Sequence, residues 1–301
     1  MRKRVLIPSA AISLLSCLTA YFLLADSDIY AQRARLAGPN VKQTASVSKV
    51  DARASSRSKA AIRNSSLRGS LSWTFSGKPQ TGWNIYVPLI SQTIGTDSGP
   101  DSNEFAVALS RWQQKSGLEQ TGVLDAGTME IFTKYWQSQR LGRFNPSPND
   151  SLLSAPIVEF FDGTRSPDLL QIEQQTYAAY KKMIAAAARD LKHELKLTAG
   201  GELAPDEKFL RLVSAYRSPE YQDALRRKQP RAGRVALAKH SPHSTGHALD
   251  IYVGGEPVKT LDSNRLIQVQ TPVYKWLVKN AARFGFYPYF YEPWHWEYVG
   301  K

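Results

Sequence analysis

Residues 241–250 read Ser241-Pro-His-Ser-Thr-Gly-His-Ala-Leu-Asp250, and they set the architecture of the carboxy-terminal half. From residue 247 the stretch has the two-residue period of a β-strand. Its faces alternate between Leu249, Ile251 and Val253 on one side and Ala248, Asp250 and Tyr252 on the other. The apolar face is expected to enter the core. Asp250 then points to the opposite side, where a carboxylate is costly unless it is paired or bound to a metal ion.

A second stretch, Tyr291-Glu-Pro-Trp-His-Trp296, predicts another strand. After its proline, the tryptophans share one face and His295 lies on the other. In the first stretch, Gly246 permits a turn that folds His243 back over the face that carries the aspartate. Two histidines and one carboxylate leave a fourth zinc position open for water, which is typical of a catalytic site. A glutamate that is not a ligand can then move the proton of that water.

Other interpretations of the histidines are weaker. A single His–Asp pair is more often a hydrogen-bonded couple in the core than a metal site, but here three sequence elements occur together. His243 and His247 match the helical zinc motif His-x-x-x-His, yet Pro242 and Gly246 oppose a helix and no glutamate follows His243. The remaining histidines are expected near the site or at the surface: His240, His247 and His193.

Three elements carry a resemblance to a known family. They are Ser241-x-His243-x-x-Gly246-x-Ala248-x-Asp250, then Glu292-Pro-Trp-His295-Trp, and upstream Ser214-Ala-Tyr-Arg217-Ser with Gln222. Together they span about residues 170–300 and resemble the VanY-type D-alanyl-D-alanine carboxypeptidases. That family belongs to a zinc superfamily with the VanX-like dipeptidases, the lysostaphin-type endopeptidases and the hedgehog fold. Ala215 stands where the family has glycine, a small-for-small departure.

The resemblance implies a role for each matching residue. It implies His243, Asp250 and His295 as the ligands of one zinc ion per chain, and Glu292 as general base and acid. It implies that Arg217 grips either a substrate carboxylate or the developing oxyanion, for which a planar guanidinium is suited. Gln222 and Ser241 are implied to line the same cleft.

A second resemblance covers residues 82–140. Helical spacing begins at Asn103, with Ser102 or Asn103 as N-cap, and Gly117 ends that helix. A turn then leads to Asp125, which is predicted to cap a second helix. The motif Gln113-x-x-x-Gly-Leu…Thr-Gly-x-Leu-Asp125 resembles the small three-helix peptidoglycan-binding domain found beside many wall hydrolases. The alternative is a helical module without a ligand, because the motif residues are chiefly core and turn positions.

The remaining segments divide the chain. Residues 1–26 hold three basic residues and then 21 uncharged residues, 5–25, which at about 1.5 Å each match the roughly 30 Å of membrane hydrocarbon. They predict a signal peptide or an uncleaved signal anchor, and the anchor is favoured because no clear cleavage site follows. Lipidation at Cys17 is a third alternative. Residues 27–80 predict a basic low-complexity linker, with order beginning near Trp83, and residues 141–165 a connector.

Charge and cysteine content narrow the function. Of the net charge of +13, residues 1–70 carry +9, from 12 Lys/Arg and 3 Asp/Glu. The basic excess therefore belongs to leader and linker, which argues against a folded groove for nucleic acid. Such a segment suits anionic lipid or wall polymer, or is simply solvated. The single cysteine excludes an internal disulfide and a cysteine-based metal site.

Residues 166–301 are expected to form an α+β domain whose small, mainly antiparallel sheet has flanking helices, preceded by the small three-helix all-α domain. The expected helices are Pro167–Leu195, Pro219–Lys228 and Thr271–Phe284, and the expected strands are Phe209–Val213, His247–Val253 and Trp294–Val299.

The sequence thus predicts a zinc peptidase of peptidoglycan stem peptides, extracytoplasmic, monomeric and anchored to the inner membrane by residues 5–25. The favoured reaction is that of a D-alanyl-D-alanine carboxypeptidase acting on D-Ala-terminated stem peptides. The alternatives are a related endopeptidase, cutting a cross-bridge or an L-Ala–D-Glu bond, and an inactive zinc-bound wall-binding protein. Glu292 and Arg217 argue against the last, because a structural zinc site needs neither.

Overall fold

The computed structural model describes residues 41–142, 145–228 and 241–300. The chain divides into two compact units, Met1–Lys49 and Val50–Lys301, and the account below concerns the second. The predicted anchor 5–25 and His240 lie outside the described residues. Within the described ranges, no helix has the length and apolar character needed to cross a membrane.

A four-stranded antiparallel sheet forms the centre of the carboxy-terminal part, in the order β5-β6-β8-β7. The strands are β5 Leu212–Ser214, β6 Ala248–Ile251, β8 His295–Tyr298 and β7 Phe286–Pro288. As predicted from the alternation, Leu249 and Trp296 enter the main core. On the other face, Asp250 pairs in register with Ser214 on one side and His295 on the other. The α+β prediction with an antiparallel sheet is confirmed.

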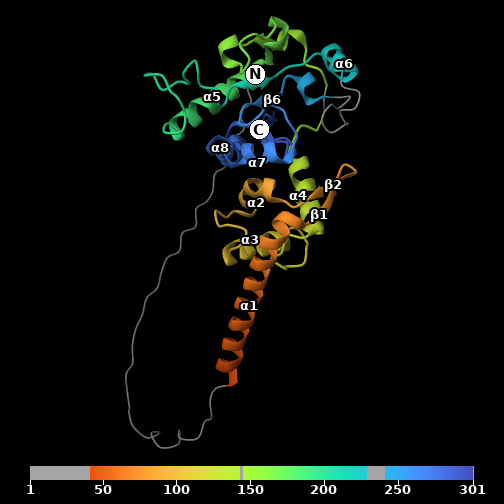
Figure 1. Cartoon of the computed structure of the whole chain (residues 1–301), viewed down its shortest axis with the longest axis vertical. Coiled ribbons are helices and arrows are strands. Elements are labelled where there is room, and N and C mark those ends of the chain that lie inside the picture. Colours follow the sequence, from red (N-terminus) through yellow and green to blue (C-terminus); the bar gives the residue numbers. More distant parts are fainter. Residues whose placement is uncertain (1–40, 143–144, 229–240, 301) are drawn as a thin grey trace, which may run out of the picture. The chain divides into compact units, whose positions relative to one another are not determined.

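Helices flank this sheet (Figure 1). They are α5 Gln174–Asp190, α6 Pro219–Lys228, α7 Asp262–Gln270 and α8 Pro272–Asn280. Helix α8 begins where the sequence predicts, because Thr271 accepts a hydrogen bond from the Tyr274 amide and Pro272 occupies the first turn. A 3-10 turn, Ala281–Phe284, extends it to Gly285, whose φ of 82° ends the helical run.

Two predicted elements differ from the structure. The helix expected over Pro167–Leu195 is only Gln174–Asp190, because Gln171–Glu173 forms a strand, β4, that pairs with β3 Leu152–Ser154. The Glu173 carboxylate accepts the amides of Gln175 and Thr176 and so fixes the first turn of α5. The strand expected at Phe209–Val213 is β5, displaced by a few residues, and α7 had no predicted counterpart.

Three helices occupy the region 82–140: α2 Val87–Ile94, α3 Asn103–Lys115 and α4 Ala126–Ser138. Ser102 caps α3 and Asp125 caps α4, as the sequence predicts. The buried Gln113 holds the turn between them, since its amide nitrogen donates to the Val123 carbonyl at 3.0 Å and its oxygen accepts the Gly122 amide at 2.8 Å. The motif glutamine thus serves the fold of the module.

The segment predicted as a linker contains regular structure. Helix α1 spans Val41–Ser70, and a hairpin follows, β1 Ser72–Phe75 with β2 Lys78–Thr81. Order therefore begins well before Trp83. Asn64 explains the difference, because its buried side chain donates to the Gly122 carbonyl and accepts the Leu124 amide, both at 2.8 Å. These contacts join α1 to the turn before α4, and no local pattern shows them.

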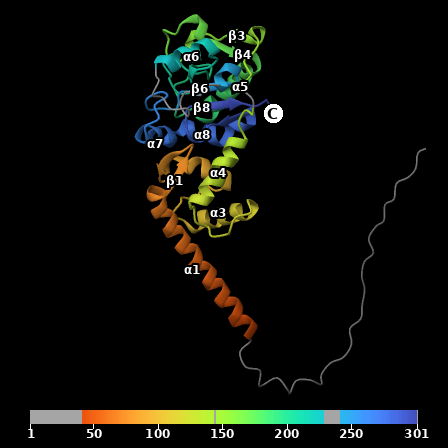
Figure 2. The same ribbon diagram turned by 90° about the vertical axis from the view of Figure 1, so that its right-hand side faces the viewer.

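The helical module and the sheet domain contact each other within the second unit. Helix α2 contacts α8, and the 3-10 turn Asn84–Tyr86 contacts α7. Figure 2 shows α7 and α8 on the side of the sheet domain that faces the module with α3 and α4. Phe290, from the loop after β7, is buried in the aromatic core of the module. Its ring centroid lies 5.5 Å from that of Tyr86 and 5.5 Å from that of Trp136. The two parts therefore share a hydrophobic core at this loop.

Candidate metal centre and substrate cleft

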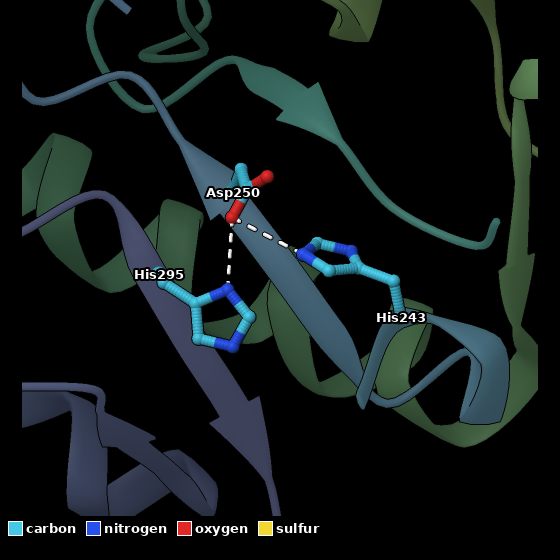
Figure 3. A group of neighbouring side chains, drawn as sticks. All are labelled: His243, Asp250 and His295. Carbon is cyan, nitrogen blue, oxygen red and sulfur yellow. Dashed lines mark hydrogen bonds and ion pairs between the residues drawn. The ribbon is translucent and has the colours of Figure 1, made fainter. Parts of the chain in front are cut away.

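Three buried side chains converge on one point: His243, Asp250 and His295 (Figure 3). Each offers one ligand atom, and these atoms lie within 4.8 Å of one another. Asp250 is in β6, His295 lies beside it in β8, and His243 lies on the 3-10 turn Pro242–Thr245 that precedes β6. The structure thus brings together the three residues that the resemblance implies as ligands.

Gly246 makes the turn that returns His243 over the sheet. Its φ is 65°, a left-handed conformation that glycine adopts without strain. A Cβ atom at this position would lie 2.9 Å from the Glu173 Cβ. The turn therefore needs glycine for its backbone conformation, as the sequence predicts, and also for space.

The His243 ring is held in one orientation. Its Nδ1 lies 2.6 Å from the Ala215 carbonyl, which only accepts hydrogen bonds, so Nδ1 carries the proton. Burial lowers the pKa of His243 to about 4, which keeps the ring neutral. Nε2 then presents a lone pair toward Asp250 Oδ1 at 3.3 Å, and it has no hydrogen-bond partner. A buried lone pair facing a carboxylate oxygen is an arrangement that a cation completes.

The His295 ring lies between two carboxylates. Nδ1 is 2.9 Å from Asp250 Oδ1, and Nε2 is 3.1 Å from Glu297 Oε1. Burial alone would lower the pKa of His295, but the hydrogen bonds to Asp250 and Glu297 outweigh it and raise this pKa to about 9 without a metal. A cation between Nδ1 and Asp250 would take the place of one proton, while Glu297 keeps the proton on Nε2.

Asp250 stays ionised in this setting. Burial would raise the pKa of its carboxyl, but the neighbouring His243 and His295 hold this pKa well below its usual range. Its second oxygen, Oδ2, accepts from Arg217 Nη2 at 3.2 Å. Two imidazole nitrogens and one carboxylate oxygen, with room for a fourth ligand, are the donor set of a catalytic zinc ion. The residues present therefore fit a single zinc ion.

Glu292 lies beside this centre and is not one of the three converging ligands. Desolvation in the cleft raises the pKa of Glu292 to about 7; His295 lowers it, and the negative charge of Asp250 raises it further. The turn before β8 sets its position, because the His295 amide donates to the Glu292 carbonyl at 2.9 Å. A carboxyl with a pKa near neutrality can both accept and return a proton.

A cavity of about 320 Å³ opens beside the centre. Arg217, Glu292 and Asp250 line it, as the resemblance implies. Its other walls are Arg165, Val213, Ser214, Tyr221, Leu225, Val258, Thr260 and Trp294.

Two predicted cleft residues instead support others. Gln222 is buried and accepts from Arg217 Nη1 at 3.4 Å. Ser241 is buried and accepts the His243 amide at 3.3 Å. Neither is among the described residues that line the cavity; Gln222 contacts the arginine and Ser241 the histidine turn, and a contact of either with substrate stays a prediction. His247 lies close by, with Nδ1 2.8 Å from Thr176 Oγ1, and His193 is exposed, in line with the sequence analysis.

Sequence reasoning missed Glu297 and Arg165. Glu297 is fully buried and binds the far side of the His295 ring. The two-residue period of β8 is the signal that identifies it, because it places Glu297 on the face of His295. Arg165 stood in the predicted connector, where nothing local marks it as part of the cleft.

The fold and site together define a metallopeptidase with a single-metal centre. Residues 169–301 match the model of the VanY family, which is described as D-alanyl-D-alanine carboxypeptidase. One solved structure that this chain resembles is a mutant of the vancomycin-resistance D,D-pentapeptidase VanY from a VanB-type resistance cassette, in complex with Zn(II). It has 22% identity and a TM-score of 0.33, over 55% of this chain and 89% of that one. Comparison with curated proteins gave no match.

Proposed function

We propose that this protein is a zinc-dependent D-alanyl-D-alanine carboxypeptidase that removes the terminal residue from peptidoglycan stem peptides. The observation that carries the proposal is the convergence of His243, His295 and Asp250 on one point, next to Glu292 and Arg217 in one cleft. The family match over residues 169–301 supports the substrate class.

His243, Asp250 and His295 would hold the metal. A bound zinc ion lowers the pKa of a water ligand and polarises a carbonyl. Glu292 accepts the proton of the attacking water as its oxygen bonds to the peptide carbonyl carbon. It then delivers this proton to the leaving nitrogen as the C–N bond breaks. The Arg217 guanidinium, held by Asp250 and Gln222, stabilises the negative charge that develops on the carbonyl oxygen.

The amino-terminal parts extend the proposal. The helices over residues 82–140 would bind peptidoglycan, and a wall-bound module would raise the local concentration of stem peptides at the cleft. Residues 5–25 would anchor the protein at the membrane with the peptidase outside the cytoplasm. Supporting observations are the apolar run and the motif that resembles a peptidoglycan-binding domain.

Mass spectrometry of purified muropeptides, after incubation with the zinc-loaded protein, tests the proposal. Loss of one terminal D-alanine is the expected result. Cleavage of a cross-link or of the L-Ala–D-Glu bond would assign an endopeptidase, and no change would assign a wall-binding protein without activity. Glu292→Gln is the matched control, because it keeps the shape of the side chain but cannot accept a proton. We expect it to lower the rate ~10²–10⁴-fold with unchanged zinc content.

A further inference from the structure

The cleft contains a second arginine that the proposed mechanism does not use. Arg165 lines the same cavity as Arg217 and Glu292. It is the last residue of the predicted connector, which runs along β5: Phe160 bridges Leu212, and the Phe161 amide donates to the Leu212 carbonyl at 2.9 Å. The edge of the sheet therefore fixes where this arginine enters the cleft.

The Arg165 side chain is held in place by neighbouring groups, but its positive charge is not neutralised by a carboxylate among the described residues. One guanidinium nitrogen donates to the Val213 carbonyl, and the guanidinium carbon lies 5.6 Å from the centroid of the Phe160 ring. Among the described residues, no carboxylate forms an ion pair with it. Its half-buried position makes an unpaired cation costly, and burial lowers the pKa of Arg165 below its usual value. An anionic ligand bound to this guanidinium would offset that cost.

The two arginines occupy different positions relative to the metal centre. Arg217 is hydrogen-bonded to Asp250, so it lies against the ligand group where the scissile carbonyl must be placed. Arg165 is instead held at Val213, next to Ser214, the residue that pairs with Asp250 across the sheet. In a peptide, the next backbone carbonyl group lies one residue, about 3.5 Å, beyond the scissile bond. For a carboxypeptidase that next group is the free terminal carboxylate.

We propose that Arg165 binds the free carboxy-terminal carboxylate of the substrate and so makes the cleft selective for chain ends. The inference rests on the proposed function. The sequence left two possible ligands for Arg217. Under this proposal Arg217 stabilises the developing oxyanion, and Arg165 binds the carboxylate. The guanidinium fork suits this because it can make two parallel hydrogen bonds to a carboxylate.

The test compares a peptide ending in D-Ala-D-Ala as free acid with the same peptide as carboxy-terminal amide. Calorimetry on the zinc-loaded full chain measures their binding in the Glu292→Gln background, with and without Arg165→Gln. Steady-state kinetics measure kcat and KM in the active background. Arg189→Gln, an exposed arginine at the end of α5, is the matched control.

We expect the free acid to bind better than the amide in the parent, and Arg165→Gln to reduce this preference ~10–100-fold, chiefly through KM. Arg165→Lys should keep part of the preference, since it keeps the charge but not the fork. Zinc content and melting temperature should match those of the parent, which excludes misfolding as the cause. An equal loss on acid and amide, or an unchanged preference in both variants, overturns the assignment. If the parent hydrolyses neither peptide, the proposed reaction fails, and calorimetry still decides the role of Arg165.

Discussion

Replacing Glu297 by glutamine should weaken metal binding although Glu297 is not a ligand. Its carboxylate is 0% exposed and receives three groups: His295 Nε2 at 3.1 Å, the Leu141 amide at 3.0 Å and the Arg140 guanidinium. The charged acceptor keeps the proton on Nε2 and directs Nδ1 toward Asp250. Glutamine preserves the volume and one acceptor but removes the charge that makes the ring a stronger donor of electrons.

The expected magnitude follows from two contacts. Loss of the partner of a metal-ligating histidine typically costs 10–100-fold in metal affinity, or about 1.4–2.7 kcal/mol. The Arg140 side chain is only 13% exposed and would lose its anionic partner. It retains Gln137 Oε1 at 2.8 Å and lies 4.0 Å from the centroid of the Tyr289 ring. We therefore expect the metal-free variant to lose about 2 kcal/mol of unfolding free energy.

Competition with a chromophoric zinc chelator measures the affinity, and thermal unfolding of the metal-free proteins measures stability. Arg140→Met is the matched control, because it breaks the same ion pair but leaves the Glu297 contact with His295 intact. It should lose stability while its zinc affinity stays within about threefold of the parent. Parental zinc affinity in Glu297→Gln, or an equal loss in Arg140→Met, would refute the positioning role.

Three further predictions address the base, the turn and the first helix. The kcat/KM of the zinc protein should rise with pH as Glu292 loses its proton. The midpoint should lie at or below pH 7, since the pKa of Glu292 is about 7 without metal and a bound cation lowers it. A pH–rate profile that is flat from pH 5 to 8 would contradict the role of Glu292 as base. Gly246→Ala should destabilise the fold by at least about 1–2 kcal/mol in denaturant unfolding, because of its φ of 65° and the 2.9 Å approach to Glu173; parental stability would show that the turn relaxes. Asn64→Ala should cost about 1–3 kcal/mol by removing both hydrogen bonds to residues 122–124, whereas no loss would show that α1 contributes nothing to the module.

The arrangement of the site could be predicted from the sequence because short-range patterns determine where its residues point. Strand alternation placed Asp250 and His295 on one face, and a glycine returned His243 to it. The helix caps at Ser102 and Asp125 were equally local, since a cap acts on an amide three residues away. Such features need no knowledge of distant partners.

What could not be predicted depends on partners far along the chain. Asn64 bonds residues 58 and 60 positions away, so a segment of unremarkable composition becomes an ordered helix. Arg140 and Glu297 are 157 positions apart. The helix expected from Pro167 starts only at Gln174 because β4 pairs with β3, and a strand pairing outweighs local helical spacing.

The helical module supports the loop between β7 and β8, which carries Glu292. Glu292 follows Phe290 by two residues, and Phe290 is 1% exposed within the module's aromatic core. Arg265 Nη1 donates both to the Tyr291 carbonyl and to the Tyr86 hydroxyl, at 3.1 Å each, so α7 ties the loop to the same core. A carboxyl that must reach a metal-bound water needs a fixed backbone. The module provides it, which makes residues 82–140 part of the site's framework in addition to any role in holding the wall.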